Sequence, residues 1–323
     1  MNAVGIDLGG TSAKLAVVDS EGKILQHRKS VWERRETVDD ILEPLIAELK
    51  DILSSTQEGR SNVVGIGLST PGYLNDDRTG IVYAANLQML NGFPLVKVLE
   101  EETGMRVVMD TDVNAGGLAE AVLGAGKDFK RVLFISIGTG LGGSLIVDRK
   151  LVRHTRHGMG HLGHIILQPD GEMCGCGNRG CVETLVSAQG IYRIAEKILP
   201  HYPTSILHEC SRSGKKIEAL DIYLSARDKS DTAAIEILQQ EGGWLGLALY
   251  NFCAICAPEV IVVGGGLSEA GNFILDKARE VVQERLNPDL YGKVEIKQSH
   301  FGVNAGVVGN AVNVMQLVRK NTT

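Results

Sequence analysis

Residues 4–19 read VGIDLGGTSAKLAVVD. An apolar strand runs into a pair of glycines, and an alternating strand follows and ends in Asp19. The same order of elements returns as VLFISIGTGLGGSLIVD at residues 132–148. Two copies of one hairpin, each with a glycine-rich turn, predict an α/β protein made of two similar halves.

The segment between the two copies combines helices and strands. Thr37 can cap a helix whose apolar residues, within 41–53, recur at steps of three and four. Strands are expected at residues 63–68 and 106–109, and the second of them runs into DTDVNAGG and a further helix. This alternation supports the α/β assignment.

The second half follows the same logic. Asp231 can start a helix that Pro258 ends, and the strand at residues 259–263 leads into Gly264–Gly266. A last helix is expected at residues 305–318. Because no Pro- or Ser-rich linker separates the halves, we expect them to share a cleft.

The composition is that of a globular chain without surplus positive charge. Its 323 residues are enough for two domains of ordinary size, and 44% hydrophobic residues can fill two cores. Scattered Lys and Arg with a net charge of −6 argue against nucleic acid as a partner, and so against a zinc-ribbon nucleic-acid module. The apolar region 243–267 contains Asn251, Pro258 and Glu259, so we expect no membrane span.

The N-terminus and the cysteine usage predict a cytoplasmic protein. MNAVGIDLGG has no basic segment before an apolar run, so it is typical of a first strand and not of a secretory signal. Six cysteines in such a chain are expected to be reduced, and closely spaced thiols then bind metals more often than they form disulfides.

Three cysteines have the spacing of a metal site. Cys174, Cys176 and Cys181 form C-x-C-x4-C and offer three thiolates, whereas a tetrahedral structural zinc needs a fourth ligand. The alternative is three free thiols in a glycine-rich loop. Cys253 and Cys256 lie in the apolar segment LYNFCAICAP, and we interpret them as core packing.

The glycine turns are candidates for phosphate binding. Gly138, Gly140 and Gly143 match G-x-G-x-x-G, but the strand SLIVD follows where a dinucleotide fingerprint requires a helix, which disfavours that reading. Backbone N–H groups of such turns can approach phosphate because no Cβ intervenes, and the turn at residues 9–11 offers the same. The alternative is that these glycines only make tight turns. Asp7, just before the first turn, could reach a Mg²⁺ ion on the phosphates.

Two carboxylates are candidates for a general base. Asp110 and Asp112 stand where a strand gives way to a helix, and phosphoryl transfer to an alcohol needs one carboxylate to accept the hydroxyl proton. The structural alternative is that Asp112 caps the helix that begins at Val113.

The order of the motifs resembles the ROK family, which contains bacterial glucokinase-like sugar kinases and sugar-responsive repressors. The motifs are DLGGT at the N-terminus, PGY at 71–73, D-x-N at 112–114, GTGLGG at 138–143, GHLGH with CGCGNRGC, and GGG at 264–266. The resemblance covers nearly the whole chain. It implies the two-lobed actin- and hexokinase-like fold, with ATP and a sugar in the cleft between the lobes.

The resemblance also implies how the chain is divided. We expect a small lobe of residues 1–115 with the helix at 305–323 packed back on it, and a large lobe of residues 116–304 that carries the zinc loop. A homodimer or higher homo-oligomer is implied by the family alone. The family's repressors carry a winged helix ahead of the first strand, and we expect none here because the chain starts six residues before Asp7.

Site residues follow from the resemblance, position by position. Asp112 is similar to the general base, and His164 closes a Cys3His zinc site that pins the loop carrying Glu183. In the family this histidine also touches the sugar. The resemblance assigns sugar contacts to Gly72, Asn86, Thr111, Asn114, His157, His161, His164 and Glu183, nucleotide phosphate contacts to Asp7, Gly9, Gly10, Thr11, Lys14, Gly138, Thr139 and Gly140, and adenosine-side contacts to Gly264, Gly265 and Gly266.

The chain departs from the family pattern in the sugar pocket. Thr111 stands where most family kinases have Asn, His161 where they have Glu, and His157 where they have a small residue. A histidine can donate a hydrogen bond where a carboxylate only accepts, and GHLGH resembles the GHIGH of N-acetylmannosamine kinases. The alternative is that His154, His157 and His161 are solvated loop residues.

These observations predict an ATP- and Mg²⁺-dependent kinase with a structural Zn²⁺. Its expected substrate is a hydroxyl, usually the 6-hydroxyl, of a hexose or an N-acylhexosamine. One alternative is a kinase of N-acetylmannosamine or of another amino sugar or cyclitol. A second alternative, from another class, is a sugar-sensing protein without turnover.

Overall fold

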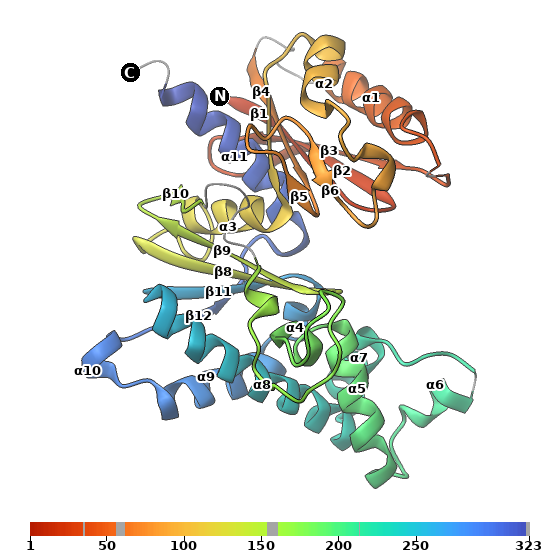
Figure 1. The fold of residues 1–323 in the computed structure, drawn as a ribbon, viewed down its shortest axis with the longest axis vertical. Helices are drawn as coiled ribbons and strands as arrows, with labels where there is room; N and C mark the ends of the chain where they lie inside the picture. The colour runs from red at the N-terminus through yellow and green to blue at the C-terminus, as the bar shows by residue number, and fades with distance from the viewer. Residues whose placement is uncertain (35, 56–61, 154–160, 213, 321–323) are drawn as a thin grey trace. The chain divides into compact units, whose positions relative to one another are not determined.

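The computed structural model describes residues 1–34, 36–55, 62–153, 161–212 and 214–320. Figure 1 shows the elements in chain order. The strands are β1 Asn2–Leu8, β2 Ser12–Asp19, β3 Ile24–Val31, β4 Val63–Thr70, β5 Tyr73–Leu74, β6 Ile81–Tyr83, β7 Val107–Thr111, β8 Arg131–Ile137, β9 Leu141–Val147, β10 Lys150–Leu151, β11 Val260–Gly264 and β12 Glu295–Gln298. The helices are α1 Asp39–Ser54, α2 Leu95–Thr103, α3 Asp112–Val122, α4 Val182–Leu185, α5 Ala188–Ile198, α6 His208–Arg212, α7 Ala219–Lys229, α8 Thr232–Cys256, α9 Asn272–Arg285, α10 Pro288–Tyr291 and α11 Ala305–Lys320.

The chain divides into two compact units. Unit 1 contains residues 1–130, 144–159 and 303–323, and unit 2 contains residues 131–143 and 160–302. The first division falls at residue 130, beyond α3, which runs on to Val122 and packs along α11. The lobe boundary at residue 115 stays a prediction.

The sheet of unit 1 has the strand order β3-β2-β1-β4-β7. β1 and β2 form the antiparallel hairpin that the opening sequence predicts, and β4 and β7 join in parallel on the other side of β1. The register places Asp7 opposite Ser69, and Ser69 opposite Asp110. The sheet thus gathers three polar side chains in one row at the ends of its parallel strands.

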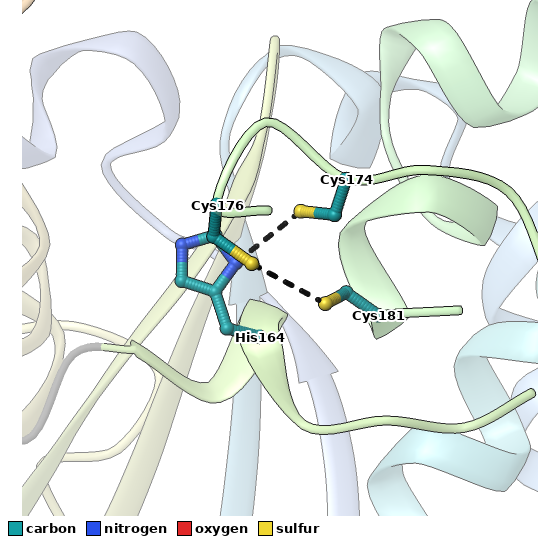
Figure 2. A group of neighbouring side chains, drawn as sticks. All are labelled: His164, Cys174, Cys176 and Cys181. Carbon is teal, nitrogen blue, oxygen red and sulfur yellow. Dashed lines mark hydrogen bonds between the residues drawn. The ribbon is translucent and has the colours of Figure 1, made fainter. Parts of the chain in front are cut away.

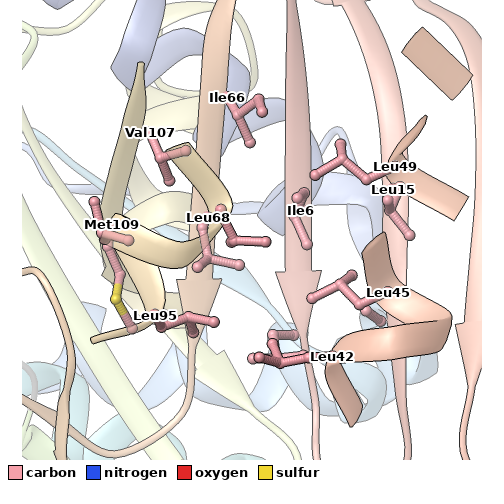
Figure 3. Close-up of a cluster of buried hydrophobic side chains, with 14 of the residues drawn as sticks. Ile6, Leu15, Leu42, Leu45, Leu49, Ile66, Leu68, Leu95, Val107 and Met109 are labelled. Atoms are coloured by element: carbon pink, nitrogen blue, oxygen red, sulfur yellow. The ribbon is translucent and has the colours of Figure 1, made fainter. Parts of the chain in front are cut away.

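Alternation along the strands separates the two faces of this sheet. Ile6, Ile66 and Leu68 point into a cluster that apolar residues of α1 and α2 complete (Figure 3). On the other face, Gly5 and Gly67 let α11 come so close that a β-carbon at either position would overlap backbone atoms of that helix. The last helix of the chain therefore packs directly on β1 and β4.

The second sheet has the order β10-β9-β8-β11-β12, and β8, β11 and β12 are parallel. α8 packs against α5, α7 and α9. Asp231 accepts a hydrogen bond from the N–H of Ala234 and so caps α8, which ends at Cys256 before Pro258, as predicted. Cys253 and Cys256 are buried on this helix, which confirms their place in the core.

The repeat predicted from the two hairpins is confirmed. β8 and β9 flank the turn at residues 138–140 as β1 and β2 flank the turn at residues 9–11, and each first strand lies next to a parallel strand. No helix among the described residues combines the length and the low charge that a membrane crossing demands.

Candidate functional site

Asp7 is the last residue but one of β1 and is held by a chain of polar groups. The Ser69 hydroxyl donates a hydrogen bond to Asp7 Oδ1 (3.0 Å), and the Asn310 Nδ2 group donates to Ser69 Oγ and to the Ile6 carbonyl (2.7 Å each). Burial raises the pKa of Asp7, and the Ser69 hydrogen bond and the Lys14 charge oppose that rise. Ser69 therefore orients the Asp7 carboxylate, and Asn310 of α11 orients Ser69.

Asp112 is the first residue of α3, and its Oδ1 accepts a hydrogen bond from the N–H of Val113 (2.8 Å), but it does not occupy the cap position. The Thr111 hydroxyl takes the cap position and accepts a hydrogen bond from the N–H of Asn114 (3.4 Å), so the cap alternative for Asp112 is wrong. Asp112 reaches solvent, yet enough protein surrounds it that desolvation, followed by the negative charge of Asp7, raises its pKa to about 6. A carboxylate with this pKa is suited to take a proton near neutral pH.

Asp110 is a structural partner of the same strand end. It is 1% exposed, and its Oδ1 accepts hydrogen bonds from Asn114 Nδ2 (2.7 Å) and from the N–H of Thr111 (2.9 Å). Arg153 Nη1 lies 2.5 Å from Oδ2 as an ion pair without hydrogen-bond geometry. With all of these contacts made, Asp110 is poorly placed to act as a base, which favours Asp112 in that role.

The first glycine turn is closed by the Gly9 N–H, which donates to the Ser12 carbonyl (2.9 Å). A β-carbon at Gly10 would lie 3.0 Å from Cβ of Asn86, so the structure brings Asn86 against this turn. Trp32 Nε1 donates to the Gly10 carbonyl (3.2 Å) and fixes the turn from another side.

Three other predicted residues lie in unit 1. Thr11 is exposed at the turn, and Lys14 is paired with Asp7 across the hairpin while its Nζ donates to the Val303 carbonyl (3.0 Å). Gly72 has φ +97°, a conformation that favours glycine, so its identity has a backbone reason whatever it binds.

The second glycine turn lies in unit 2. The Gly138 N–H donates to the Gly140 carbonyl (2.9 Å), Thr139 is exposed at the tip, and β9 follows, which confirms that no helix N-terminus stands here. Glu183 Oε2 accepts a hydrogen bond from the N–H of Leu141 (3.0 Å), the residue directly after the turn.

The third glycine cluster serves two purposes. β-carbons at Gly264 and Gly265 would collide with Phe134 and Ile137 of β8, so these two glycines allow close packing. Gly266 has open space around its α-carbon and lines a cavity of about 530 Å³. The cavity wall is apolar apart from Glu269 and the Tyr223 hydroxyl and consists of Gly138, Ala188, Ile191, Ala219, Leu220, Tyr223, Leu238, Gly266, Leu267, Glu269 and Ala270.

Four side chains of unit 2 converge as a metal site would require (Figure 2). The ligand atoms of His164, Cys174, Cys176 and Cys181 all lie within 4.8 Å of one another. His164 Nδ1 is 3.6 Å from Cys174 Sγ, and Cys176 Sγ is 3.7 Å from Cys181 Sγ. Zn–S bonds of about 2.3 Å in a tetrahedron give edges of roughly 3.5–3.8 Å, so the donor set fits zinc.

The backbone explains how the cysteine loop is shaped. The Cys174 N–H donates to the Asn178 carbonyl (2.8 Å), and Gly177 takes φ +91° between them. The backbone N–H of Asn178 lowers the pKa of Cys176, whereas burial raises that of Cys181 to about 12, so Cys176 is the first thiol ready to give a thiolate.

His161 lies beside the metal ligand His164 in a short 3-10 turn. The two rings stack with centroids 6.1 Å apart and planes 8° from parallel, and His161 is exposed. The ring of His161 is therefore held next to the zinc site without joining its ligand set. His154 and His157 lie outside the described residues.

The chain is similar to known proteins over nearly its whole length. The sequence profile of the ROK family matches residues 3–317. The chain belongs to the ROK family. It is 34% identical to a glucokinase of Halalkalibacterium halodurans over 315 residues, which are 97% of this chain and 94% of the glucokinase.

Other ROK proteins match just as broadly. A crystal structure of a Streptomyces griseus ROK glucokinase with glucose and AMPPNP superposes with a TM-score of 0.81 at 29% identity, covering 98% of this chain and 100% of that one. The Bacillus subtilis xylose repressor is 27% identical and matches 95% of this chain and 75% of its own length. The fold is the actin- and hexokinase-like fold of the ROK sugar kinases.

The ROK motifs could be recognised in the sequence, but the residues that hold the motif side chains in place could not. Asp7, Asp112, Asn114, Lys14 and Asn86 belong to unit 1, and the second and third glycine turns, Glu183 and the zinc ligands belong to unit 2. Sequence reasoning missed Ser69, Asn310, Arg153 and Tyr223. Only Ser69 left a signal, since it ends a buried parallel strand next to β1.

Proposed function

We propose that this ROK protein is an ATP-dependent sugar kinase that phosphorylates a hydroxyl of a hexose or an N-acylhexosamine, with Asp112 as the general base. The observation that carries the proposal is the state of Asp112, a solvent-reaching carboxylate at the start of α3 whose pKa is raised to about 6. The glucokinases among its relatives support the same class of reaction.

The acceptor chemistry needs few groups. A sugar hydroxyl placed against Asp112 passes its proton to this carboxylate while its oxygen bonds to the terminal phosphorus of ATP and the bond from that phosphorus to ADP breaks. Asp110, bound by Asn114 and Arg153, fixes the strand end from which Asp112 projects. The Thr111 hydroxyl accepts the hydrogen bond that caps α3. A hydrogen bond between this hydroxyl and the sugar would therefore have to form alongside the cap.

The nucleotide is assigned to the glycine turns and the cavity. The Gly9 and Gly138 N–H groups close their own turns, so the phosphate contacts that the ROK resemblance implies are assigned to the backbone N–H groups at residues 10–11 in unit 1 and at 139–140 in unit 2. The apolar cavity that connects Gly138 with Gly266 in unit 2 has room for a planar base, and the Tyr223 ring is part of its wall.

Magnesium fits the carboxylate donors of unit 1. Asp7 and Asp112 are close enough that the charge of Asp7 raises the pKa of Asp112, a repulsion that a divalent cation relieves. Asp7 would hold the ion, which supplies positive charge to the phosphates of ATP. Ser69 keeps the Asp7 carboxylate directed for this purpose.

Zinc fits the Cys3His site as a structural ion. His164, Cys174, Cys176 and Cys181 would hold it, and it would pin the loop that leads into α4 and Glu183. The role of Glu183 and His164 as sugar contacts rests on the ROK resemblance.

The sugar specificity is assigned to the positions that differ from the family pattern. His161, stacked on His164, presents a ring that can donate a hydrogen bond where a Glu cannot, which favours an acceptor such as an N-acyl carbonyl. This observation favours an N-acetylmannosamine-type or other amino-sugar kinase over a glucokinase. Homodimer formation is proposed from the family alone.

The test is a panel of neutral hexoses, N-acylhexosamines and cyclitols with Mg-ATP, read out as sugar-dependent ADP formation. We expect turnover with an N-acylhexosamine or a hexose, and we expect His161→Glu combined with Thr111→Asn to shift the preference toward glucose. If no sugar raised ADP formation above the sugar-free rate, the kinase proposal would fail.

The same panel separates the alternative class. Repressors occur among the relatives, so a sugar-sensing role without turnover is the second candidate. Sugar binding by calorimetry with no ADP formation would favour it.

A further inference from the structure

The Glu183 carboxylate contacts the phosphate turn as well as the zinc loop. Its Oε2 accepts a hydrogen bond from the N–H of Leu141 (3.0 Å), and its Oε1 lies 3.8 Å from Cys174 Sγ. All three residues belong to unit 2. One side chain therefore links the metal site with the turn assigned to the phosphates.

The lack of a side chain at Gly140 leaves room for the Glu183 carboxylate. A β-carbon at residue 140 would lie 3.0 Å from Cδ of Glu183 and would overlap Oε2, the oxygen that holds Leu141. Gly140 has no positive φ, so its backbone alone does not require glycine. A β-carbon at Gly138, in the same turn, would meet nothing within 4 Å. The glycine at 140 thus keeps space for Glu183, whereas the one at 138 does not.

The two oxygens of Glu183 have different partners. Oε2 accepts from the Leu141 N–H, whereas Oε1 faces the zinc loop at Cys174. The hydrogen bond to the turn therefore uses only one oxygen of the carboxylate.

We propose that Glu183 is a positioning residue for the phosphate turn, in addition to its assigned contact with the sugar. Oε2 accepts the hydrogen bond from the Leu141 N–H and so fixes the backbone of residues 138–140. The absence of a β-carbon at Gly140 leaves the space that Oε2 occupies. One carboxylate then orders the turn for ATP and receives the sugar. The inference rests on the proposed kinase function, because it assumes that the turn binds nucleotide phosphates.

The test is a double-mutant cycle on AMPPNP affinity, measured by calorimetry with Mg²⁺ and the zinc-loaded full chain, without sugar. Glu183→Ala is expected to weaken AMPPNP binding about tenfold, because a charge-assisted hydrogen bond that orders the turn is lost. Gly140→Ala is expected to do the same by displacing the carboxylate. The double variant should be no weaker than either single one, since both remove one contact.

Two further variants guard against a general loss of structure. Glu183→Gln keeps an oxygen that can accept from Leu141, so it should retain most of the AMPPNP affinity. Gly138→Ala is the matched change in the same turn. Any loss of AMPPNP affinity that it causes should combine independently with the loss from Glu183→Ala, so the two factors should multiply in the double variant.

Three results would overturn the inference. These are wild-type affinity in Glu183→Ala, losses in Gly140→Ala and Glu183→Ala that multiply, and an equal loss in Glu183→Gln and Glu183→Ala. Wild-type protein that binds no AMPPNP would count against the kinase function itself and overturn the inference with it.

Discussion

The zinc loop of unit 2 and the strand-end carboxylates of unit 1 reach a defined geometry by different means. The loop has little regular structure, and its four ligand atoms, all within 4.8 Å of one another, converge through a short knuckle around Gly177. Asp7 lies near the end of β1 and Asp112 comes directly after β7, so the parallel pairing of β1, β4 and β7 sets their places.

The geometry of the zinc loop is set by nearby residues, whereas that of the carboxylates is set by distant ones. A metal site is specified locally, because ligand types and spacing are enough to choose a tetrahedral ion. Strand-end carboxylates are specified by packing from distant parts of the chain, since Asn310 of the last helix directs Ser69, which directs Asp7 of the first strand. Removing a zinc ligand should therefore damage structure, and removing a carboxylate should damage chemistry.

The largest expected effect is that of Asp112→Asn in the carboxylate region. Turnover should fall by roughly 10³-fold, because the amide cannot take the hydroxyl proton. The fold should persist, and the melting temperature at pH 7 should not fall. The folded pKa of Asp112, about 6, lies above its ordinary value, so ionised Asp112 opposes folding above pH 6 and this cost fades as the pH falls below that value. Steady-state kinetics together with calorimetric melting measure both parts, and retained turnover would remove Asp112 from the role of base.

The opposite pattern is expected for Cys176→Ala in the zinc loop. Three ligands remain, so the ion should be lost and the melting temperature should fall by about 5 °C or more. Elemental analysis and calorimetry measure these outcomes. Cys253→Ala, a buried cysteine outside the ligand set, is the matched control and should keep its metal content. Unchanged zinc in Cys176→Ala would contradict the assignment of this ligand.

A smaller effect is expected from pH. Asp112 must be ionised to act as base, and burial and the charge of Asp7 raise its pKa to about 6 without the metal. In an assay with Mg-ATP, kcat/KM for the sugar should therefore rise with pH through that value or somewhat below it, because Mg²⁺ offsets the charge of Asp7. One pH unit below the pKa seen in this assay, activity should be about tenfold under the plateau. The slope should disappear in the residual activity of Asp112→Asn. A flat profile between pH 5 and pH 7, roughly the range around that pKa, would argue against the base.

The smallest effect is expected for Ser69→Ala, which leaves every proposed ligand in place. Asp7 loses the hydrogen bond that directs its carboxylate, so kcat should fall about fivefold and the Mg²⁺ concentration needed for half-maximal rate should rise. Ser30→Ala is a fitting control, because Ser30 Oγ is buried in the same unit without a hydrogen-bond partner in the described part of the chain. Equal behaviour of the two variants would remove Ser69 from the support of Asp7.

The sequence was informative wherever a motif is local. The hairpin repeat, the strand after GTGLGG, the helix from Asp231 to Pro258 and the convergence of His164 with three cysteines all follow from patterns within a few tens of residues. Supports that depend on long-range packing could not be read. Arg153 on Asp110 and Asn310 on Ser69 join segments far apart in the sequence, and no spacing rule indicates them. The choice between Asp110 and Asp112 also needed the structure, because only the partners of Asp110 show that it is engaged.

Phosphorus NMR of the wild-type protein with Mg-ATP and each sugar of the panel follows phosphoryl transfer from ATP to a sugar hydroxyl. With at least one sugar, the terminal ATP signal should be replaced by that of a phosphate monoester as ADP appears. Asp112→Asn should yield no such signal over the same time. A spectrum in which no sugar gives a monoester would contradict this transfer.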